Sequence, residues 1–212
     1  MCRLILIRLK QNALFTLGYP ATVSDITLKA WRLAVKKTTR YTQRDSEQRK
    51  HFLRLRERYR RKAKHFIYID ESGFELQAAR RFGYAPCGKR VYGEVSGQKR
   101  PRTSLLAARM PDGTLAATFL WQGTCNTCIF NLWCKELLST LLNEDSVVIL
   151  DNASFHKSAA TRELVEQTEA KLLFLPPYSP DLNPIERDFD TLKKIREYNH
   201  EKSIDEIIRM YK

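Results

Sequence analysis

Three acidic residues, Asp70, Asp151 and Glu186, are placed in the sequence so that they could form one site for hard metal ions. Asp70 follows the apolar run 66–69, and Asp151 follows the apolar run 147–150. Short, fully apolar runs are typical of buried parallel strands, and open α/β sheets place their sites at the carboxyl ends of such strands. If the two runs are neighbouring strands, the two carboxylates meet at one edge of the sheet.

Glu186, near the start of the last long predicted helix, supplies a third carboxylate. Carboxylates a few ångströms apart repel one another and stay ionised together only when a cation lies between them. An all-oxygen set with open positions suits Mg²⁺ or Mn²⁺ rather than zinc. Two such ions ~3.5–4 Å apart stabilise both the attacking and the leaving oxygen of a phosphodiester. We therefore take Asp70, Asp151 and Glu186 as candidate catalytic residues and metal ligands, with two Mg²⁺ ions as the expected cofactor and Mn²⁺ as a substitute.

Each acid alone has a plainer interpretation. An aspartate after a strand is more often a turn residue or a helix cap. A glutamate in the first turn of a helix often only offsets the helix dipole. The metal hypothesis therefore depends on the residues that surround the three acids and on the elements that carry them.

The predicted elements follow one another in an order that indicates a mixed sheet. Three strands, the last two joined by the turn Pro-Asp-Gly at 111–113, precede helix, strand, helix, strand and helix. Alternation of strands and helices after an antiparallel start favours an α/β fold, a mixed five-stranded sheet flanked by helices, which is the order of the RNase H-like fold. The strands are predicted at 65–70, 103–109, 114–121, 146–151 and 171–175, with a strand-like run at 90–94, and the helices at 126–142, at 158–168 and around Glu186.

The predicted helix 126–142 is amphipathic. Its apolar residues recur at three- and four-residue steps, as on a helix that packs one face on a sheet. The expected inner stripe is Ile129, Leu132, Trp133, Leu137 and Leu141.

Positive charge is concentrated in the first third of the chain, which has 212 residues and a net charge of +13. Residues 1–64 hold 18 Lys and Arg against 4 Asp and Glu, whereas residues 65–212 hold 19 against 20. A basic arm beside a neutral domain favours nucleic-acid binding through counterion release; a solvated basic helix or tail is the alternative. We therefore divide the chain into a basic helical N-terminal arm, 1–64, and a catalytic domain, 65–212.

Other function classes receive little support. No apolar run reaches the ~20 residues that span a bilayer, and the first ten residues lack the apolar core of a secretory signal. The protein is therefore expected in the cytoplasm, with no membrane partner. The five cysteines are odd in number and lack a spaced framework, so we expect free thiols. The lone pair Cys125 and Cys128 lacks the further ligands that a structural zinc site needs.

Three blocks of sequence around the acids resemble the conserved blocks of a known family. The blocks are Ile69-Asp70-Glu71-Ser72-Gly73-Phe74, Leu150-Asp151-Asn152-Ala153-Ser154-Phe155-His156-Lys157-Ser158 and Leu175-Pro-Pro-Tyr-Ser-Pro-Asp-Leu-Asn-Pro-Ile-Glu186. They resemble the mariner-type insertion-sequence transposases of bacteria, a branch of the DDE superfamily named for two aspartates and a glutamate. The second and third acids are separated by 34 residues, 152–185, the spacing of that branch. The similarity covers residues 36–197 and includes the intervening segments 82–90 and 104–113.

The resemblance implies a DNA transposase. Such an enzyme cuts phosphodiester bonds at transposon ends and joins the freed 3′-hydroxyl ends to target DNA, with Asp70, Asp151 and Glu186 as metal ligands. It implies double-stranded DNA as partner, a homodimer on that DNA and a place at the nucleoid. Asn152 and His156 are then candidates to orient a carboxylate or touch a phosphate. For His156, a contact at a helix start is the plainer alternative.

The chain departs from the family pattern before and after the three blocks. Only the last helix of the family's helix-turn-helix region is recognisable, at 21–35, and Phe189 stands where relatives often carry tryptophan. The segment 203–212 also ends early for the family. We therefore expect a truncated or frame-shifted copy with intact catalytic residues and lost recognition of transposon ends. An RNase H-like nuclease that cuts without joining, or an inactive DNA-binding remnant, stays open as an alternative, and terminal repeats, target preference and oligomeric state are left undetermined.

Overall fold

The computed structural model describes residues 42–74, 86, 88–90, 92, 102–199 and 201–211. The chain divides into two compact units, Met1–Tyr41 and Thr42–Lys212. The first unit lies outside the described residues, and so does the partial helix-turn-helix expected at 21–35. Most of the strand-like run at 90–94 and of the similar segment 82–90 also lies outside them. The second unit carries the three acids and is described below.

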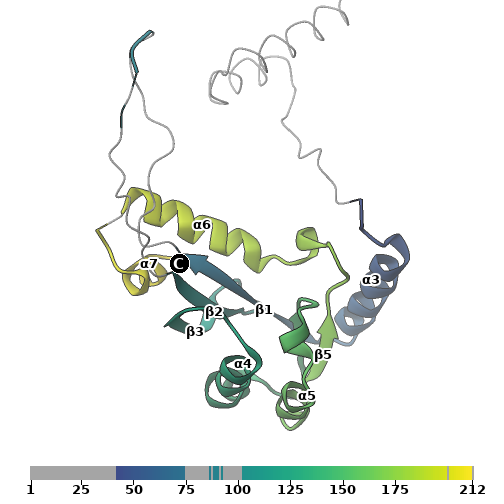
Figure 1. Cartoon of the computed structure of the whole chain (residues 1–212). Coiled ribbons are helices and arrows are strands. Elements are labelled where there is room, and N and C mark those ends of the chain that lie inside the picture. Colours follow the sequence, from purple (N-terminus) through teal and green to yellow (C-terminus); the bar gives the residue numbers. More distant parts are fainter. Residues whose placement is uncertain are drawn as a thin grey trace, which may run out of the picture. The chain divides into compact units, whose positions relative to one another are not determined.

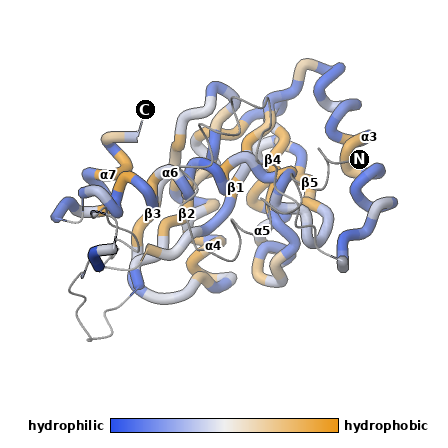
Figure 2. The backbone as a smooth tube through the Cα atoms, turned by 90° about the horizontal axis from the view of Figure 1, so that it is seen from above, coloured by the Kyte–Doolittle hydropathy of each residue, from blue (hydrophilic) through white to orange (hydrophobic). Residues whose placement is uncertain are grey.

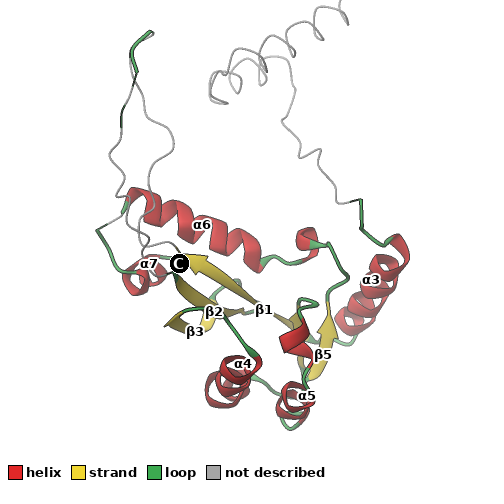
Figure 3. Ribbon diagram, in the orientation of Figure 1, coloured by secondary structure: helices red, strands yellow, loops and turns green. Residues whose placement is uncertain are grey.

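A five-stranded mixed sheet forms the centre of this unit (Figures 1 and 3), in the order β3-β2-β1-β4-β5. β1 pairs antiparallel with β2 and parallel with β4, while β2 pairs antiparallel with β3 and β4 parallel with β5. The fold predicted from the order of elements is thereby confirmed. The strands are β1 (His65–Phe74), β2 (Thr103–Arg109), β3 (Leu115–Gln122), β4 (Ser146–Leu150) and β5 (Lys171–Phe174).

The hairpin between β2 and β3 turns at the residues that its sequence indicated. The N–H of Gly113 donates to the carbonyl of Met110 at 2.9 Å, and the N–H of Met110 donates to the carbonyl of Thr114 at 2.8 Å. Gly113 has a φ of +91°, a conformation that glycine adopts without steric penalty. The turn therefore joins β2 and β3, the two strands on the antiparallel side of β1, and sets how they begin to pair.

One face of the sheet is covered by α4 (Thr127–Trp133) and α5 (Ala159–Glu166). The continuation of α4 runs through a π-helical stretch, η1 (Cys134–Leu138), and a 3₁₀ turn, η2 (Ser139–Leu141). Apolar side chains on this face form one buried cluster, in which Phe130 and Trp133 are the largest residues. Sheet residues of the cluster alternate along each strand, as expected for a strand with one face on this layer. They are Ile67, Ile69, Leu106, Ala108, Val148 and Leu150.

The predicted inner stripe of helix 126–142 is wrong in part. Leu132 is 55% exposed, and the buried positions are Phe130, Trp133, Cys134 and Leu138. Trp133 is common to both stripes, and Leu137 packs against the same cluster, whereas Phe130 takes the place expected for Ile129 and Leu132. Phe130, Trp133 and Leu137 recur at three- and four-residue steps, so the predicted period is right and only the face before Trp133 was misplaced.

The opposite face is covered by α6 (Ile185–Tyr198) and α7 (Ile204–Met210), with the 3₁₀ turn η4 (Pro180–Leu182) ahead of α6. Ile185, Phe189 and Leu192 of α6 pack with Leu105 and Ala107 of β2 in a second buried cluster. The helix α7 was absent from the sequence prediction, although Ser203 and Glu206 form a capping box at its start. Thus α6, which carries Glu186, is held directly on the sheet.

The helix α3 (Ser46–Arg61) begins after Asp45, whose carboxylate accepts hydrogen bonds from the N–H groups of Glu47 and Gln48. Its outward residues are mostly hydrophilic, whereas the central strands are apolar (Figure 2). Phe52 is buried in a third cluster, with Val147, Ile149, Leu175 and Leu182. The predicted division at residue 64 assigned this helix to the arm, but the structure groups it with the sheet, since the two units divide between Tyr41 and Thr42.

Candidate active site

Asp70 and Asp151 occupy equivalent positions on neighbouring parallel strands. The register of β1 and β4 pairs Tyr68 with Ile149. Continued by two residues, it sets Asp70 level with Asp151, the first residue after β4. The negative charge of Asp151 contributes to the raised pKa of the Asp70 carboxyl, so the two side chains are near each other. The structure thus brings these two predicted site residues to the same edge of the sheet.

The strand β1 does not end at Asp70, as the sequence suggested, but continues to Phe74. Beyond Tyr68 it keeps its antiparallel partner, and Asp70 pairs with Ala107 of β2. On the other side β4 ends at Leu150, so β1 projects past it. Asp70 is therefore held by β2 on one side and lies level with Asp151, the residue that follows β4, on the other.

The Asp70 carboxylate accepts two hydrogen bonds. The N–H of Glu71 donates to Oδ1 at 2.8 Å, and Asn183 Nδ2 donates to Oδ2 at 3.0 Å. Asn183 is only 4% exposed. It lies 113 residues away in sequence, directly after η4, so this bond joins the sheet to the segment that precedes α6.

Burial raises the pKa of the Asp70 carboxyl to about 7, although the hydrogen bond from the Glu71 N–H opposes the rise. The negative charges of Asp151, Glu186 and Glu71 raise it further. Asp151 and Glu186 therefore both lie within electrostatic reach of Asp70. A carboxyl group in this position is ionised at neutral pH only at a free-energy cost that a bound cation removes.

Asp151 is held by groups of its own segment. Its Oδ1 accepts the N–H of Ala153 at 3.0 Å and contacts Nδ1 of His156 at 2.6 Å. Burial raises the pKa of Asp151, but these hydrogen bonds and the positive charges of His156 and Lys157 outweigh it, so the pKa is lowered overall. Its Oδ2 makes no hydrogen bond to any of the described residues and is left for a ligand.

His156 lies in the 3₁₀ turn η3 (Ser154–Lys157) and is 1% exposed. Its ring centroid lies 4.2 Å from that of Phe155 and 4.3 Å from that of Phe130. Nε2 is buried without a hydrogen-bond partner among the described residues. Of the roles considered for His156, orientation of a carboxylate is the one its contacts support.

Glu186 is the second residue of α6 and is half-buried. Pro184, the last proline of the segment 176–184, takes the N-cap position, and the helix begins at the next residue, Ile185. The N–H of Glu186 donates to the carbonyl of Asn183 at 3.4 Å. Among the described residues, no three acidic, histidine or cysteine side chains converge closely enough to enclose a metal ion.

Residues 65–208, more than half of the chain, match the family of DDE superfamily endonucleases. The chain belongs to this family. No curated protein sequence matches it. Solved structures at 16–17% sequence identity share the fold of this chain.

Three solved structures illustrate the shared fold. A pre-cleavage Mos1 transpososome superimposes with a TM-score of 0.60 at 16% identity, over 94% of this chain and 69% of that chain. The Mos1 transposase paired-end complex with left transposon end gives 0.58 at 17% identity, over 88% and 60%. The mariner Mos1 paired-end complex with Mg gives 0.57 at 17% identity, over 86% and 64%. The present chain therefore spans 60–69% of the length of these chains.

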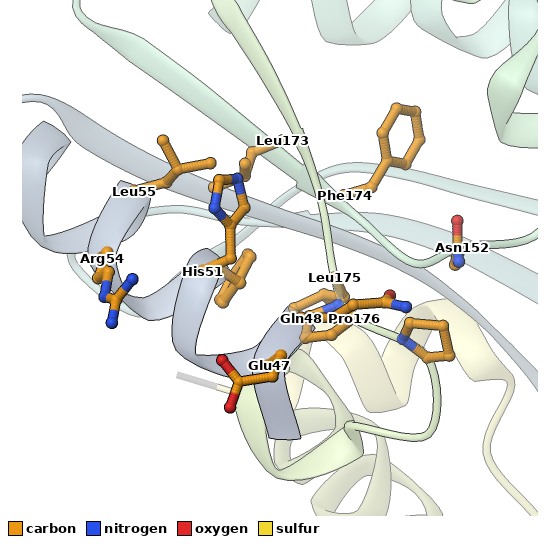
Figure 4. A pocket seen from close by; sticks show the side chains of 12 residues that line it. Glu47, Gln48, His51, Arg54, Leu55, Asn152, Leu173, Phe174, Leu175 and Pro176 are labelled. Atoms are coloured by element: carbon orange, nitrogen blue, oxygen red, sulfur yellow. The ribbon is translucent and has the colours of Figure 1, made fainter. Parts of the chain in front are cut away.

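A groove of about 540 Å³ lies between α3 and the segment that leads out of β5 (Figure 4). Gln48, His51 and Arg54 of α3 line it on one side, and Pro176 lines it on the other. Asn152, the residue after Asp151, lies at the far end of the groove from Arg54. Asn152 makes no hydrogen bond to the described residues, so it borders the groove and does not orient either aspartate.

Asn183 is the site residue that the sequence did not single out. It stands in the block that resembles the family, between Leu182 and Pro184. Nothing in that pattern distinguishes an amide that caps a turn from one that donates to a carboxylate 113 residues away. Only the packing of the turn η4 beneath β1 brings the two groups together.

Two further findings concern the cysteines and membrane-spanning helices. Cys125, Cys128 and Cys134 are free thiols in the described part of the chain. Burial raises the pKa of Cys125 and of Cys134 to about 12, which makes these thiols poor nucleophiles. Within the described residues, no helix combines the length and the apolar composition needed to cross a bilayer.

Proposed function

We propose that this chain is the catalytic part of a DNA transposase. It cuts phosphodiester bonds at transposon ends and joins the 3′-hydroxyl ends to target DNA, with two divalent cations held by Asp70, Asp151 and Glu186. The observation that carries the proposal is the level placement of Asp70 and Asp151 on adjacent parallel strands, with Glu186 close enough to raise the pKa of Asp70. Membership of the DDE endonuclease family adds the expectation of a phosphodiester substrate.

The donor set fits hard divalent cations. It consists of carboxylate oxygens, which Mg²⁺ and Mn²⁺ prefer, and it includes Oδ2 of Asp151, which the described residues leave without a hydrogen bond. The raised pKa of Asp70 indicates a buried negative charge that a cation would compensate. When bound, the cations would favour deprotonation of the attacking water or hydroxyl and stabilise the leaving oxygen.

The residues around the acids hold the carboxylates in place. Asn183 and the N–H of Glu71 orient the two oxygens of Asp70, one donor to each. His156 and the N–H of Ala153 occupy Oδ1 of Asp151 and direct Oδ2 to the open side. Hydrogen-bond donors such as these favour the ionised form of a carboxylate and fix its orientation. A carboxylate that binds a metal ion needs both, because its geometry is then set before the cation binds.

The partner and the origin of the chain belong to the same proposal. The Mos1 structures with the same fold are complexes with transposon ends, and one contains Mg. By analogy we propose double-stranded DNA as partner, a homodimer on DNA, Mn²⁺ as a substitute for Mg²⁺, and a mariner-type bacterial insertion sequence as the source. The groove beside Asn152 offers a path for a strand at the cutting site, since Arg54 and His51 can contact phosphates.

One experiment tests the proposal. The full chain is incubated with supercoiled plasmid and Mn²⁺ or Mg²⁺, with a chelator control, and with labelled oligonucleotides that end in a 3′-hydroxyl. Metal-dependent nicking together with joined products is the expected result. Nicking without joining would assign the chain to the RNase H-like nucleases that only cut. DNA binding without either activity would mark it as an inactive remnant.

A further inference from the structure

The turn η4 and the residue that follows it, Pro180–Asn183, are held from two sides. On one side Arg49 of α3 makes two parallel hydrogen bonds to Asp181, with Nη1 to Oδ1 at 3.0 Å and Nη2 to Oδ2 at 2.7 Å. Arg44 lies 3.8 Å from the same carboxylate. The Arg49 side chain is 8% exposed, whereas Asp181 is 55% exposed. A buried guanidinium with this paired geometry is a directional anchor and not a casual surface contact.

An apolar contact supports the same junction. Phe52, three residues after Arg49 and hence on the same face of α3, packs in one cluster with Leu182 of the turn. The cluster also contains Val147 and Ile149 of β4. Turn, helix and strand thus share one core, and α3 restrains the turn through both a charged pair and a buried ring.

On the other side, Asn183 connects the turn to two of the three acids. Its side chain donates to Asp70, and its backbone carbonyl accepts the N–H of Glu186. Its own N–H donates to the carbonyl of Pro180 at 2.9 Å. Both its side chain and its main chain are therefore engaged, and a shift of the turn moves Asp70 and the start of α6 together.

We infer that Arg49 and Asn183 are positioning residues that set the separation of Asp70 and Glu186, with α3 as the anchor of the turn between them. The inference rests on the proposed function, because it concerns how two proposed ligands are held. It extends the catalytic unit to a helix that lies before the family match, which begins at residue 65. Functional groups need to be held within ~0.5 Å of their working geometry by supporting contacts, and the turn receives such contacts from α3 on one side and from β1 on the other.

Mn²⁺ titration of the full chain tests the role of Asn183. Asn183→Ala is expected to weaken Mn²⁺ binding ~10- to 100-fold, the usual effect of removing a group that orients a metal ligand. The matched control is Asn199→Ala, which removes an amide that bonds the carbonyl of Ile195 at the other end of α6. The control should bind Mn²⁺ as the unaltered chain does. Affinity for DNA without metal should be the same in all three proteins.

Arg49 is tested with two mild substitutions. Arg49→Lys keeps the charge but loses one of the two parallel hydrogen bonds, and Asp181→Asn removes the charge of the half-exposed partner without removing a buried atom. Each should weaken Mn²⁺ binding several-fold, and Arg49→Lys, which keeps the charge pair, should lower the melting temperature less than Asp181→Asn, which leaves a buried cation without its anionic partner. Lys50→Gln, one residue further on α3 and exposed, is the matched control and should have no effect on Mn²⁺ binding. A loss of melting temperature with unchanged Mn²⁺ affinity would show a purely structural role and overturn the inference.

A double variant tests whether Arg49 acts through Asn183. If Arg49 acts through Asn183, the double variant Arg49→Lys/Asn183→Ala should lose less Mn²⁺ affinity than the product of the two single losses, because the side-chain bond to Asp70 is already broken and only the main-chain bond to Glu186 remains. Effects that multiply independently would overturn the proposed connection. Failure of the unaltered chain to bind Mn²⁺ would instead contradict the proposed function itself. Normal Mn²⁺ binding by both single variants would contradict the inference and leave the function standing.

Discussion

His156 donates to Asp151 from a ring that is enclosed by aromatic side chains. The distance between Nδ1 and Oδ1 is 2.6 Å, and the ring contacts Phe130 and Phe155. The lowered pKa of Asp151 keeps this carboxylate ionised at neutral pH, and an ionised carboxylate only accepts hydrogen bonds. Nδ1 of His156 must therefore carry a proton and act as the donor to this carboxylate.

This relationship predicts the effect of His156→Phe. A phenyl ring fits the aromatic surroundings in shape but cannot donate to Asp151, so packing is retained and the orientation of the carboxylate is lost. We expect a melting temperature close to that of the unaltered chain and a ~10-fold loss of Mn²⁺ affinity. Titration calorimetry measures the affinity and scanning calorimetry the melting temperature. Unchanged affinity would mean that Asp151 does not depend on His156.

Asp151→Asn removes one charge and one ligand oxygen while keeping the shape of the side chain. We expect no detectable Mg²⁺-dependent nicking of plasmid, weaker Mn²⁺ binding and unchanged affinity for DNA in the absence of metal. Asp190→Asn, on the exposed side of α6, is the control for the loss of one negative charge and should cut normally. Normal cutting by Asp151→Asn would exclude the three-acid site.

The raised pKa of Asp70 predicts how the stability of the metal-free chain depends on pH. The pKa is about 7 in the folded chain against 3.8 as the ordinary value. A raised carboxyl pKa means that stability is fully present below the ordinary pKa and is lost as the pH rises through the folded one. Between pH ~4 and ~7 the metal-free chain should therefore lose up to roughly 4 kcal/mol from this group, since one pKa unit corresponds to about 1.36 kcal/mol.

Asp70→Asn removes this dependence. At pH ~8 the metal-free variant should be more stable than the unaltered chain, and the difference should vanish near pH ~4. Urea unfolding at a series of pH values measures it. Saturating Mg²⁺ should raise the stability of the unaltered chain at the higher pH and leave the variant almost unaffected, because a ligand that binds only the folded state stabilises it. Equal stability of both proteins at the higher pH would contradict a buried charge at Asp70.

Two truncations separate the basic arm from the helix α3. Removal of residues 1–41 takes away the first compact unit and should leave a folded protein. Removal of residues 1–64 also deletes α3 and so exposes Val147, Ile149, Leu175 and Leu182. Loss of the buried ring of Phe52 alone should cost roughly 3–5 kcal/mol. We therefore expect the shorter protein to unfold at a clearly lower temperature, and equal melting temperatures would show that α3 is only an appendage.

The same truncations test the electrostatic part of DNA binding. The excess positive charge of the first 64 residues divides into +7 for residues 1–41 and +7 for residues 42–64. Removal of 1–41 should weaken DNA binding at low salt and flatten the slope of log K against log salt by ~0.9 for each phosphate that the protein no longer neutralises. The remaining slope would then be due to the compact unit, α3 included. A slope that does not change would mean that residues 1–41 do not bind phosphates.

The three acids and the order of strands and helices were accessible from the sequence, because both leave local patterns. An apolar run that ends in Asp70 or Asp151 records a buried strand, and the Pro-Asp-Gly turn records a hairpin. The local pattern was less precise in the helix that follows Asn126. Apolar residues occupy two adjacent stripes there, and only packing on the sheet shows that Phe130 and not Leu132 faces the core.

Interactions between distant segments were decided by the tertiary structure alone. The amide of Asn183 meets Asp70 across 113 residues, and the guanidinium of Arg49 meets Asp181 across 132. Asparagine, arginine and aspartate occur many times in the chain, so residue type alone does not single out these four residues. A basic residue on a basic helix indicates a solvated face or a bond to phosphate, and only the packing of Phe52 against Leu182 turns Arg49 inward. Sequence therefore determined which carboxylates we propose as cation ligands, and the packing of α3, η4 and β1 decided which groups contact Asp70 and the turn before Glu186.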